Sequence, residues 1–322
     1  MVKVLDQAKK YPLQMRDVYC RALIDAAEAD ERVFVLDCDL VSSIGDASFV
    51  KRFPDRTINC GIQEANACAF AAGMSSRGFI PFFHSFGVFA SRRITDQLYI
   101  SCAYAGLNVK IVGADPGVTA AVNGGTHMAL EDAGIVRVIP GMTIVEPSDP
   151  IMMYSLTRKI AAHYGVDYLR MQRKNALQIY GEGSEFELGK GVLLRDGDDV
   201  AILASGLMVP EALEAARALY EMGVSARVAD MYSIKPIDRD LILDSARKTG
   251  AVVTAENHNI IGALGSAVAE VLGEGCPVPL ERVGAQDHFG EVGSVEYLKE
   301  RFGLTAKVIQ EKVLRAISRK NK

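Results

Sequence analysis

The sequence predicts an α/β protein of two domains, each with a mostly parallel sheet flanked by helices. Two observations lead to this fold class. Short apolar runs such as VFVLD and VKIVGA, typical of strands buried on both faces, alternate along the chain with stretches of helical periodicity. The 322 residues are enough for two domains of ordinary size, and a composition of 49% hydrophobic and 24% charged residues indicates large cores rather than disorder.

The first domain is expected to cover residues 1–180. Its predicted strands are, in chain order, residues 33–37, 57–59, 80–85, 109–114, 143–147 and 168–171. Its predicted helices are residues 15–30, an alanine-rich helix that begins at Glu64, a long helix over about 86–104, and a helix over about 149–163. The glycine-rich loop DPGVTAAVNGGTH, after strand 109–114, has the composition of a turn that contacts a substrate.

A domain boundary is predicted within residues 174–189, KNALQIYGEGSEFELG, where glycine, serine and glutamate interrupt the alternation. The second domain is expected to cover residues 190–322, as a separate α/β unit. Its predicted elements are strands 199–205, 225–231, 251–256 and one near 280–283, with helices over 209–222, near 238–248, over 261–272 and two at the C-terminal end.

Charge and composition exclude several classes of function. A net charge of -4 argues against nucleic acid or an anionic membrane surface as the main partner. The six cysteines form no C-x-x-C pair, which is typical of reduced core residues in a cytoplasmic protein. The N-terminal MVKVLDQAKK lacks the apolar segment of a secretory signal, and no run of 18 apolar residues predicts a membrane span.

One stretch, RTINCGIQEANACAFAAG at residues 56–73, places a single acid at the start of an apolar helix. Acids are common in the first turn of a helix because its N-terminal end carries partial positive charge, and most are solvated. The helix after Glu64 has so little polarity that we expect it to be buried nearly all round. A buried carboxylate is costly without a partner, so Glu64 is predicted to be a site acid with a raised pKa.

Several motifs resemble one family. GIQEANACAFAAG, IPFFHSFGVFASRRITDQL, LNVKIVGADPGVTAAVNGGTHMALED and RVIPGMTIVEPSD recur in the order and at the spacing of the pyrimidine-binding domain of transketolases. The later AENHNIIGALGSAVAE and DHFGEVGS look like the transketolase C-terminal domain. The resemblance covers nearly the whole chain and is strongest to the separate C-terminal subunit of split transketolases.

The resemblance implies thiamine diphosphate as cofactor. In that family the glutamate at the position of Glu64 hydrogen-bonds N1′ of the aminopyrimidine, which favours the 4′-imino form that deprotonates the thiazolium. Phe86 and Phe89, expected at i and i+3 on one helix face, would form the slot in which the aminopyrimidine stacks. Taken alone, paired phenylalanines more often belong to the core. Ile62, just before Glu64, is also assigned to the cofactor.

The same resemblance assigns a sugar-binding set. His127, in GGTH, matches an active-site histidine that contacts the sugar and is assigned a catalytic role with Glu64. Arg16, Ser43 and Arg173 match positions around the sugar phosphate, to which the planar fork of an arginine can donate two parallel hydrogen bonds.

Three positions depart from the family pattern. Asp115 stands where a phosphate-contacting histidine is usual, Asn123 replaces an aspartate that reads a donor hydroxyl, and Met128 replaces a glutamine. A carboxylate beside a phosphate repels it, so we expect either that a nearby arginine neutralises Asp115, with Arg92 and Arg93 as candidates, or that the anionic end of the sugar sits differently. The resulting hypothesis is a transketolase-type ketol transfer from a non-standard ketose, such as a branched sugar phosphate or a sulfonated ketose, to an aldose phosphate.

The diphosphate half of a thiamine enzyme is not apparent in this sequence. The family marks it with G-D-G followed by a distant N, and this chain has no such motif in the right context. We therefore expect a transketolase N-terminal subunit to bind the diphosphate and Mg²⁺, in a heterotetramer that is needed for activity. The alternatives are a subunit like 1-deoxyxylulose-5-phosphate synthase, one like the beta subunit of 2-oxo-acid dehydrogenases, or a non-catalytic assembly subunit.

Overall fold

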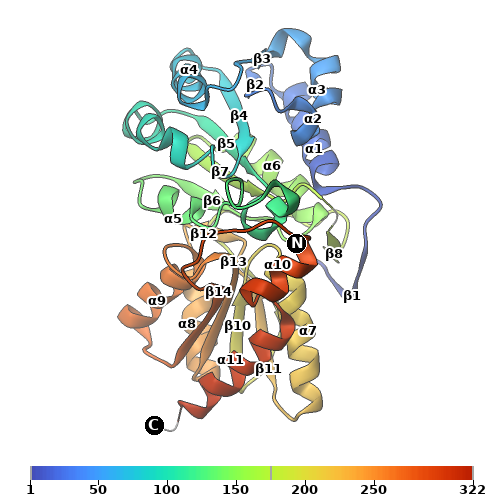
Figure 1. Cartoon of the computed structure of the whole chain (residues 1–322), viewed down its shortest axis with the longest axis vertical. Helices are drawn as coiled ribbons and strands as arrows, with labels where there is room; N and C mark the ends of the chain where they lie inside the picture. The colour runs from blue at the N-terminus through green and yellow to red at the C-terminus, as the bar shows by residue number, and fades with distance from the viewer. Residues whose placement is uncertain (1, 175, 321–322) are drawn as a thin grey trace.

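The computed structural model describes residues 2–174 and 176–320, and in this part of the chain each half of the molecule contains one large sheet (Figure 1). The first sheet has the order β12-β6-β7-β5-β4-β2-β3 and is parallel except for its edge strand β12. Its strands are β2 (Val33–Asp37), β3 (Thr57–Asn59), β4 (Ile80–Phe86), β5 (Val109–Ala114), β6 (Thr143–Val145), β7 (Val166–Met171) and β12 (Ser233–Lys235).

Helices cover both faces of this sheet, because its strands are apolar on both sides. On one face lie α1 (Met15–Ala29) and α6 (Pro150–Ala162); on the other lie α4 (Glu64–Ser76), the π-helix η3 (Gln97–Tyr104) and α5 (Asp132–Arg137). The shorter pieces are α2 (Val41–Ile44), α3 (Ala47–Arg52) and the 3₁₀ turns η1 (Pro54–Arg56), η2 (Arg92–Ile94) and η4 (Gly117–Asn123).

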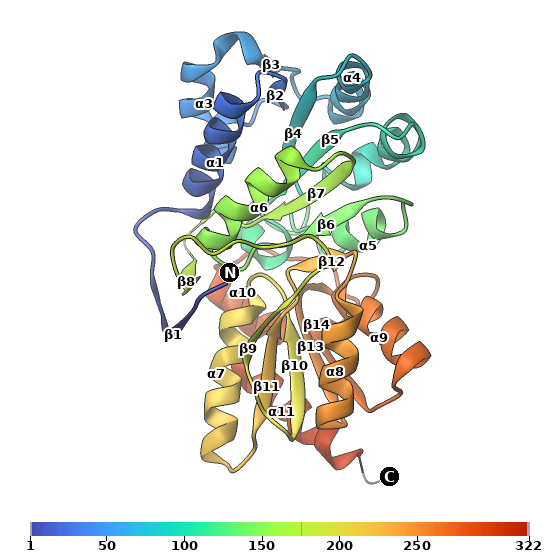
Figure 2. The ribbon, with the colours of Figure 1, turned by 180° about the vertical axis from the view of Figure 1, so that it is seen from behind.

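The second sheet has the order β14-β13-β10-β11-β9, parallel except for β9. Its strands are β9 (Val192–Arg195), β10 (Val200–Ala204), β11 (Ala226–Asp230), β13 (Val252–Asn259) and β14 (Leu280–Ala285). Helices α7 (Met208–Glu221) and α11 (Ala306–Ser318) cover one face, α8 (Arg239–Thr249) and α9 (Leu264–Gly275) the other, and α10 (Val295–Phe302) lies near the junction of the halves (Figure 2). The fold class predicted from the sequence, two α/β domains, is confirmed.

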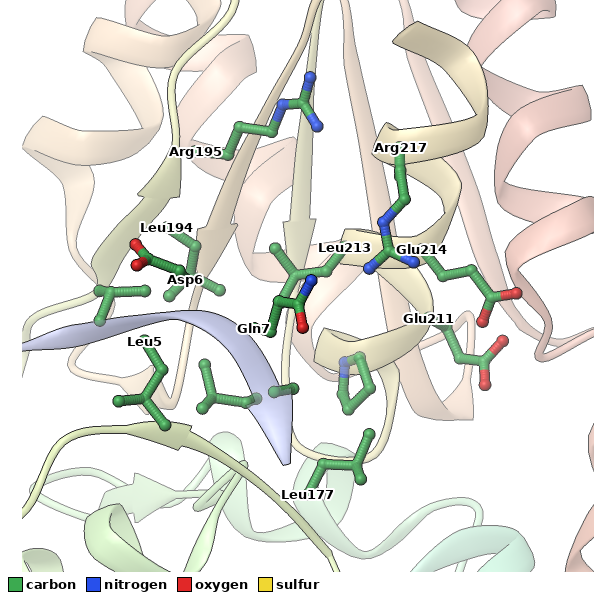
Figure 3. A pocket seen from close by; sticks show the side chains of 14 residues that line it. Leu5, Asp6, Gln7, Leu177, Leu194, Arg195, Glu211, Leu213, Glu214 and Arg217 are labelled. Carbon is green, nitrogen blue, oxygen red and sulfur yellow. The ribbon is translucent and has the colours of Figure 1, made fainter. Parts of the chain in front are cut away.

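Two pairings tie the halves together. Strand β12, which follows β11 in the second half, pairs with β6 and completes the first sheet. The N-terminal strand β1 (Val4–Lys10) pairs with β8 (Leu177–Tyr180) as an antiparallel ribbon beside the junction. Between this ribbon and α7 lies a cavity of about 850 Å³, lined by residues such as Leu5, Leu177, Leu213 and Arg217 (Figure 3). None of the predicted site residues, all of which the structure describes, lines it.

Two expectations about the first domain are wrong. The long helix over 86–104 is broken: β4 runs on through Phe86, a turn and η2 follow, and the chain then becomes the π-helix η3. Helix α4 is also not buried all round, since Asn66, Ala69 and Phe70 are exposed on one side. This apolar helix therefore presents an uncovered face in the single chain.

All six cysteines are free, and four of them, Cys20, Cys38, Cys68 and Cys102, are buried. Within 2–174 and 176–320, no helix combines the length and the apolar character that crossing a bilayer requires.

Candidate active site

The predicted site residues gather at the carboxyl edge of the first sheet. Phe86 ends β4, Asp115 follows β5, and Arg173 comes two residues after β7. Because these strands are parallel neighbours, their carboxyl ends meet at one edge, where open α/β sheets bind ligands. Ser43 lies in α2, on the segment that leaves the end of β2, and Arg16 lies in the first turn of α1.

Glu64 is buried with both carboxylate oxygens engaged. It begins α4 and is 1% exposed. Ser85 donates from Oγ to Oε1 at 3.1 Å, and Arg93 donates from Nη1 to Oε2 at 2.5 Å. The helix N-terminus and the guanidinium both offset the cost of burying this negative charge. Nearby Cys38 is affected in turn, because burial and then the Glu64 charge raise the pKa of its thiol to about 12.

The rings of Phe86, Phe89 and His127 lie close together, and Arg93 links this group to Glu64. Phe89 follows Phe86 through a turn, with its N–H donating to the Phe86 carbonyl at 2.8 Å, rather than along a helix face as expected. The His127 ring stands edge-on to both, at centroid distances of 5.6 Å to Phe86 and 5.2 Å to Phe89. The Arg93 guanidinium lies 4.0 Å from the Phe89 centroid. Arg93 therefore contacts Glu64 and the aromatic slot at the same time.

Asp115 is neutralised by an arginine, as one of our two expectations required, but not by Arg92 or Arg93. Arg173 donates to Asp115 Oδ2 from Nε at 2.7 Å and from Nη2 at 2.5 Å. Arg92 pairs instead with Glu131 at 2.9 Å. Asp115 is 1% exposed and has a φ of +49°, so the fork of Arg173 compensates a buried charge in a strained turn.

Arg173 and Arg16 converge on the segment that carries Ser43. Arg173 donates from Nη1 to the Ser43 carbonyl at 2.8 Å, and Arg16 donates to the same carbonyl at 3.2 Å. The Arg173 guanidinium also lies 4.9 Å from the Phe86 centroid. A series of contacts thus leads from Glu64 through Arg93, the three rings and Arg173 to the Ser43 backbone carbonyl, which Arg16 also contacts.

The remaining predicted residues lie at the rim. Ile62 is 73% exposed, just before α4, and Asn123 is exposed at the end of η4. Met128 is buried and lines a cavity of about 450 Å³ between the 125–131 segment and residues 287–290 of the second half.

Asn257, on β13 of the second half, holds the glycine-rich loop in place. Its amide accepts from the Val118 N–H and donates to the Pro116 carbonyl, both at 2.9 Å. Between these two residues, Gly117 has a φ of +57°, and a Cβ there would lie 2.1 Å from Asn257 Oδ1. Only glycine therefore allows the loop to pack so closely against the second half.

Arg170 also links the two halves at this junction. It is fully buried and donates to Asp132, to Glu146 and to the Asn257 carbonyl. Burial alone would raise the pKa of Asp132, but the Arg170 charge holds it below its usual value. Burial, and then Arg170, lower the pKa of His258 to about 4, so this imidazole is neutral at pH 7. These contacts hold β13 of the second half against the residues of the first half that lie next to the glycine-rich loop.

Sequence reasoning did not assign site roles to Ser85 or Asn257. Successive residues of a strand face opposite sides, so a serine beside Phe86 on β4 could have been placed toward α4 and its glutamate. The signal for Asn257 was weaker: a polar side chain in AENHN, directly after a predicted buried strand.

Comparisons with known proteins agree with this geometry. Residues 11–178 match the family model described as transketolase, pyrimidine binding domain, and residues 189–309 match transketolase, C-terminal domain. The 6-deoxy-6-sulfo-D-fructose transketolase subunit SqwH of Clostridium sp. (strain MSTE9) is 52% identical over 95% of both chains. A putative transketolase C-terminal section of Methanocaldococcus jannaschii is 41% identical over 93% of this chain and 95% of its own. A solved structure titled split gene transketolase, inactive beta4 tetramer, superposes with a TM-score of 0.88 at 42% identity, over 96% of this chain and 99% of its own. The chain belongs to the transketolase family of transferases and corresponds to the C-terminal subunit of a split transketolase.

Proposed function

We propose that this chain is the pyrimidine-binding subunit of a transketolase that takes a two-carbon ketol unit from a sulfonated ketose and transfers it to an aldose phosphate. The choice of a sulfonated substrate is based on the net charge of the residues that are predicted to bind the anionic end of the sugar. The similarity to a subunit named for 6-deoxy-6-sulfo-D-fructose supports it.

The anion-binding group consists of Arg16, Arg173 and Asp115. Asp115 takes two of the donors of Arg173 and cancels its charge, so two arginines and one aspartate leave a net charge of +1. A sulfonate carries one negative charge, whereas a phosphate monoester carries about -1.5 to -2 at pH 7. A group with one net positive charge balances the sulfonate and leaves a phosphate partly uncompensated.

The residues around Glu64 suit the aminopyrimidine of thiamine diphosphate. A planar group, the Arg93 guanidinium, already contacts both the Glu64 carboxylate and the Phe89 ring, which are the two contacts that a stacked, hydrogen-bonded heterocycle needs. When bound, the cofactor supplies the nucleophilic carbon that accepts the ketol unit. Glu64 then holds a proton against ring nitrogen N1′, and Ser85 keeps the carboxyl group oriented by donating to Oε1.

The sugar end is assigned to other residues of this chain. His127, wedged against Phe86 and Phe89 and hydrogen-bonded through Nδ1 to Thr126 at 2.9 Å, presents its imidazole to the donor hydroxyls. Arg16 and Arg173 hold the anionic end, and the buried Phe86 ring with the half-buried Phe89 and His127 rings limits access of water to the space between.

A second chain is needed to complete the enzyme. Apolar side chains of α4 and η3 are exposed side by side, among them Phe70 at 46%, Ile100 at 53% and Tyr104 at 83%. We assign this surface to contact with an N-terminal, diphosphate-binding subunit that also holds Mg²⁺, in a cytoplasmic heterotetramer.

The test uses this chain co-purified with a transketolase N-terminal subunit, thiamine diphosphate and Mg²⁺. Ketol transfer is followed by mass spectrometry with a sulfonated ketose and with the matching ketose phosphate as donors. We expect turnover of the sulfonate and its loss in Glu64→Gln, while Glu270→Gln, which alters an exposed acid paired with Arg137, remains active. Turnover confined to the phosphate would refute the sulfonated donor, and full activity of Glu64→Gln would refute the role of Glu64.

A further inference from the structure

A buried group of titratable side chains lies outside the catalytic residues. Asp37 ends β2, His84 lies on the neighbouring strand β4, and Asp46 precedes α3. All three are 0% exposed. One donor atom from each, a carboxylate oxygen or an imidazole nitrogen, lies within 4.8 Å of the other two.

Within the described residues, four polar atoms of this group find no hydrogen-bond partner. They are Asp37 Oδ2, both carboxylate oxygens of Asp46, and His84 Nδ1. His84 Nδ1 lies only 2.6 Å from Asp46 Oδ2, yet the two are not aligned as donor and acceptor. Leaving buried polar atoms unpaired costs about 1–3 kcal/mol for each group, and more for charged groups. Two buried carboxylates that face the same point require positive charge there.

The other atoms of the group are already oriented. The Tyr19 hydroxyl lies 2.6 Å from His84 Nε2, and Asp37 Oδ1 accepts from the Leu40 N–H at 2.5 Å. A hydrogen bond at one imidazole nitrogen leaves the other as a ligand with a defined direction, as is usual for histidines that bind metals. The free atoms are thus one nitrogen and carboxylate oxygens, a donor set that suits a divalent transition metal.

We propose that Asp37, Asp46 and His84 form a binding site for a divalent transition-metal ion, such as Zn²⁺ or Mn²⁺. The two carboxylates balance the charge of the ion. The site belongs to this chain alone and is distinct from the Mg²⁺ that we assign to the partner subunit.

The ion has a structural role. Asp37 and Asp46 bracket the segment that carries the Ser43 carbonyl, which accepts from both Arg16 and Arg173. An ion bound to both aspartates and to His84 fastens the two ends of this segment to β4. It thereby fixes the backbone on which the two arginines are arranged, without contacting them.

The experiment uses the full chain without thiamine diphosphate or Mg²⁺. Metal is first measured by mass spectrometry in the purified protein and then removed with a chelator. Mn²⁺ is added back, and its binding and its coordination to ¹⁴N are followed by electron paramagnetic resonance. We expect about one ion per chain, with a directly bound nitrogen.

Three variants make the assignment specific. His84→Gln should abolish the nitrogen coupling and weaken Mn²⁺ binding by about tenfold or more, and Tyr19→Phe should weaken binding but keep the coupling. His163→Gln, in which the altered histidine is partly exposed and pairs with Asp167, should change neither. A wild-type chain that holds no metal and binds no Mn²⁺ or Zn²⁺ would overturn the proposal, as would nitrogen coupling that survives in His84→Gln. If His84→Gln fails to fold, the wild-type stoichiometry and coupling together with Tyr19→Phe still decide the question.

Discussion

Arg93 and Glu64, 29 residues apart in the chain, form an ion pair of 2.5 Å at the mouth of α4. The Glu64 side chain is 2% exposed and that of Arg93 is 42% exposed, so only the arginine has a route into solvent. In this chain the guanidinium covers the Phe89 face that the aminopyrimidine is proposed to use. Binding of the cofactor then requires Arg93 to leave both the acid and the ring.

We therefore predict that Arg93→Ala binds thiamine diphosphate more tightly. The variant has no ion pair or cation–π contact to break. Each contributes roughly 0.5–1 kcal/mol at a partly exposed site, so together they correspond to a Kd about 5- to 30-fold lower. Calorimetric titration of the complex measures the change. Arg92→Ala, which breaks the neighbouring pair with Glu131, is the matched control and should leave the Kd unchanged. A higher Kd for Arg93→Ala would show instead that Arg93 contributes to the binding of thiamine diphosphate.

A second prediction concerns Asp115→Asn. The amide still accepts from Arg173 but removes one negative charge, so the anion-binding group rises from +1 to +2. One charge near the bound anion is worth about 1–3 kcal/mol at a partly buried site, so the KM for a ketose phosphate should fall roughly 10- to 100-fold relative to that for a sulfonated ketose. The ratio of the two KM values in one enzyme preparation is its own control. An unchanged ratio would show that Asp115 does not determine the preference between the two substrates.

Asn257→Ala should loosen the glycine-rich loop without touching the cofactor. It removes two buried hydrogen bonds, from Val118 and to Pro116, at a cost of about 1–3 kcal/mol in the free energy of unfolding. We expect KM for the ketose to rise while the Kd for thiamine diphosphate stays constant. Ser205→Ala, which deletes a hydrogen bond to Glu146 at the same junction, should lower stability but leave KM unchanged. Equal effects of the two variants on KM would contradict a specific role for Asn257.

The buried carboxyl group of Asp230 should make the stability of the protein depend on pH. Burial raises its pKa to about 7, against hydrogen bonds from Ser148 and Tyr180 that lower it. Below about pH 4 the carboxyl group is protonated in both states; from about 4 to 7 it ionises in the unfolded chain first. Its contribution to stability is therefore lost as pH rises through this range. Asp230→Asn has no carboxyl group to ionise and should not lose this stability. The Tm of the variant minus the Tm of the wild type should therefore increase from pH 4 to pH 7. A constant difference would contradict the raised pKa.

Most strands and helices could be predicted from the sequence, because apolar runs and helical periodicity are local signals. The exceptions depend on strand pairing or on helix types that these local signals do not indicate. Strand β8 lies in a segment with the composition of a linker and forms only by pairing with β1. The segment after β4 has a 3₁₀ turn and a π-helix, whose periods differ from the α-helical pattern that predicted one long helix.

The sequence indicates which residues are candidates for the site but not which of them pair with one another. From the sequence, Arg92 and Arg93 are the candidates for an ion pair with Asp115, whereas its partner in the structure is Arg173. Sheet order explains the difference: β5 pairs with β7, with Ala114 opposite Met171, so the residues that follow both strands emerge side by side. A sequence shows which strands exist but not which are neighbours, and ion pairs between strand ends depend on the latter.

Strand β12 also bears on how far the two halves are independent. The edge strand of the first sheet comes from residues 233–235, well beyond the linker. A chain that ended after β8 would leave the backbone of β6 unpaired along a buried edge, a template for pairing with other chains. A cut in the linker would thus give two fragments held together by shared strand hydrogen bonds, and the first half expressed by itself would tend to aggregate. The first half is therefore not expected to be an autonomous folding unit when the chain ends at the linker, because its sheet is completed only by β12.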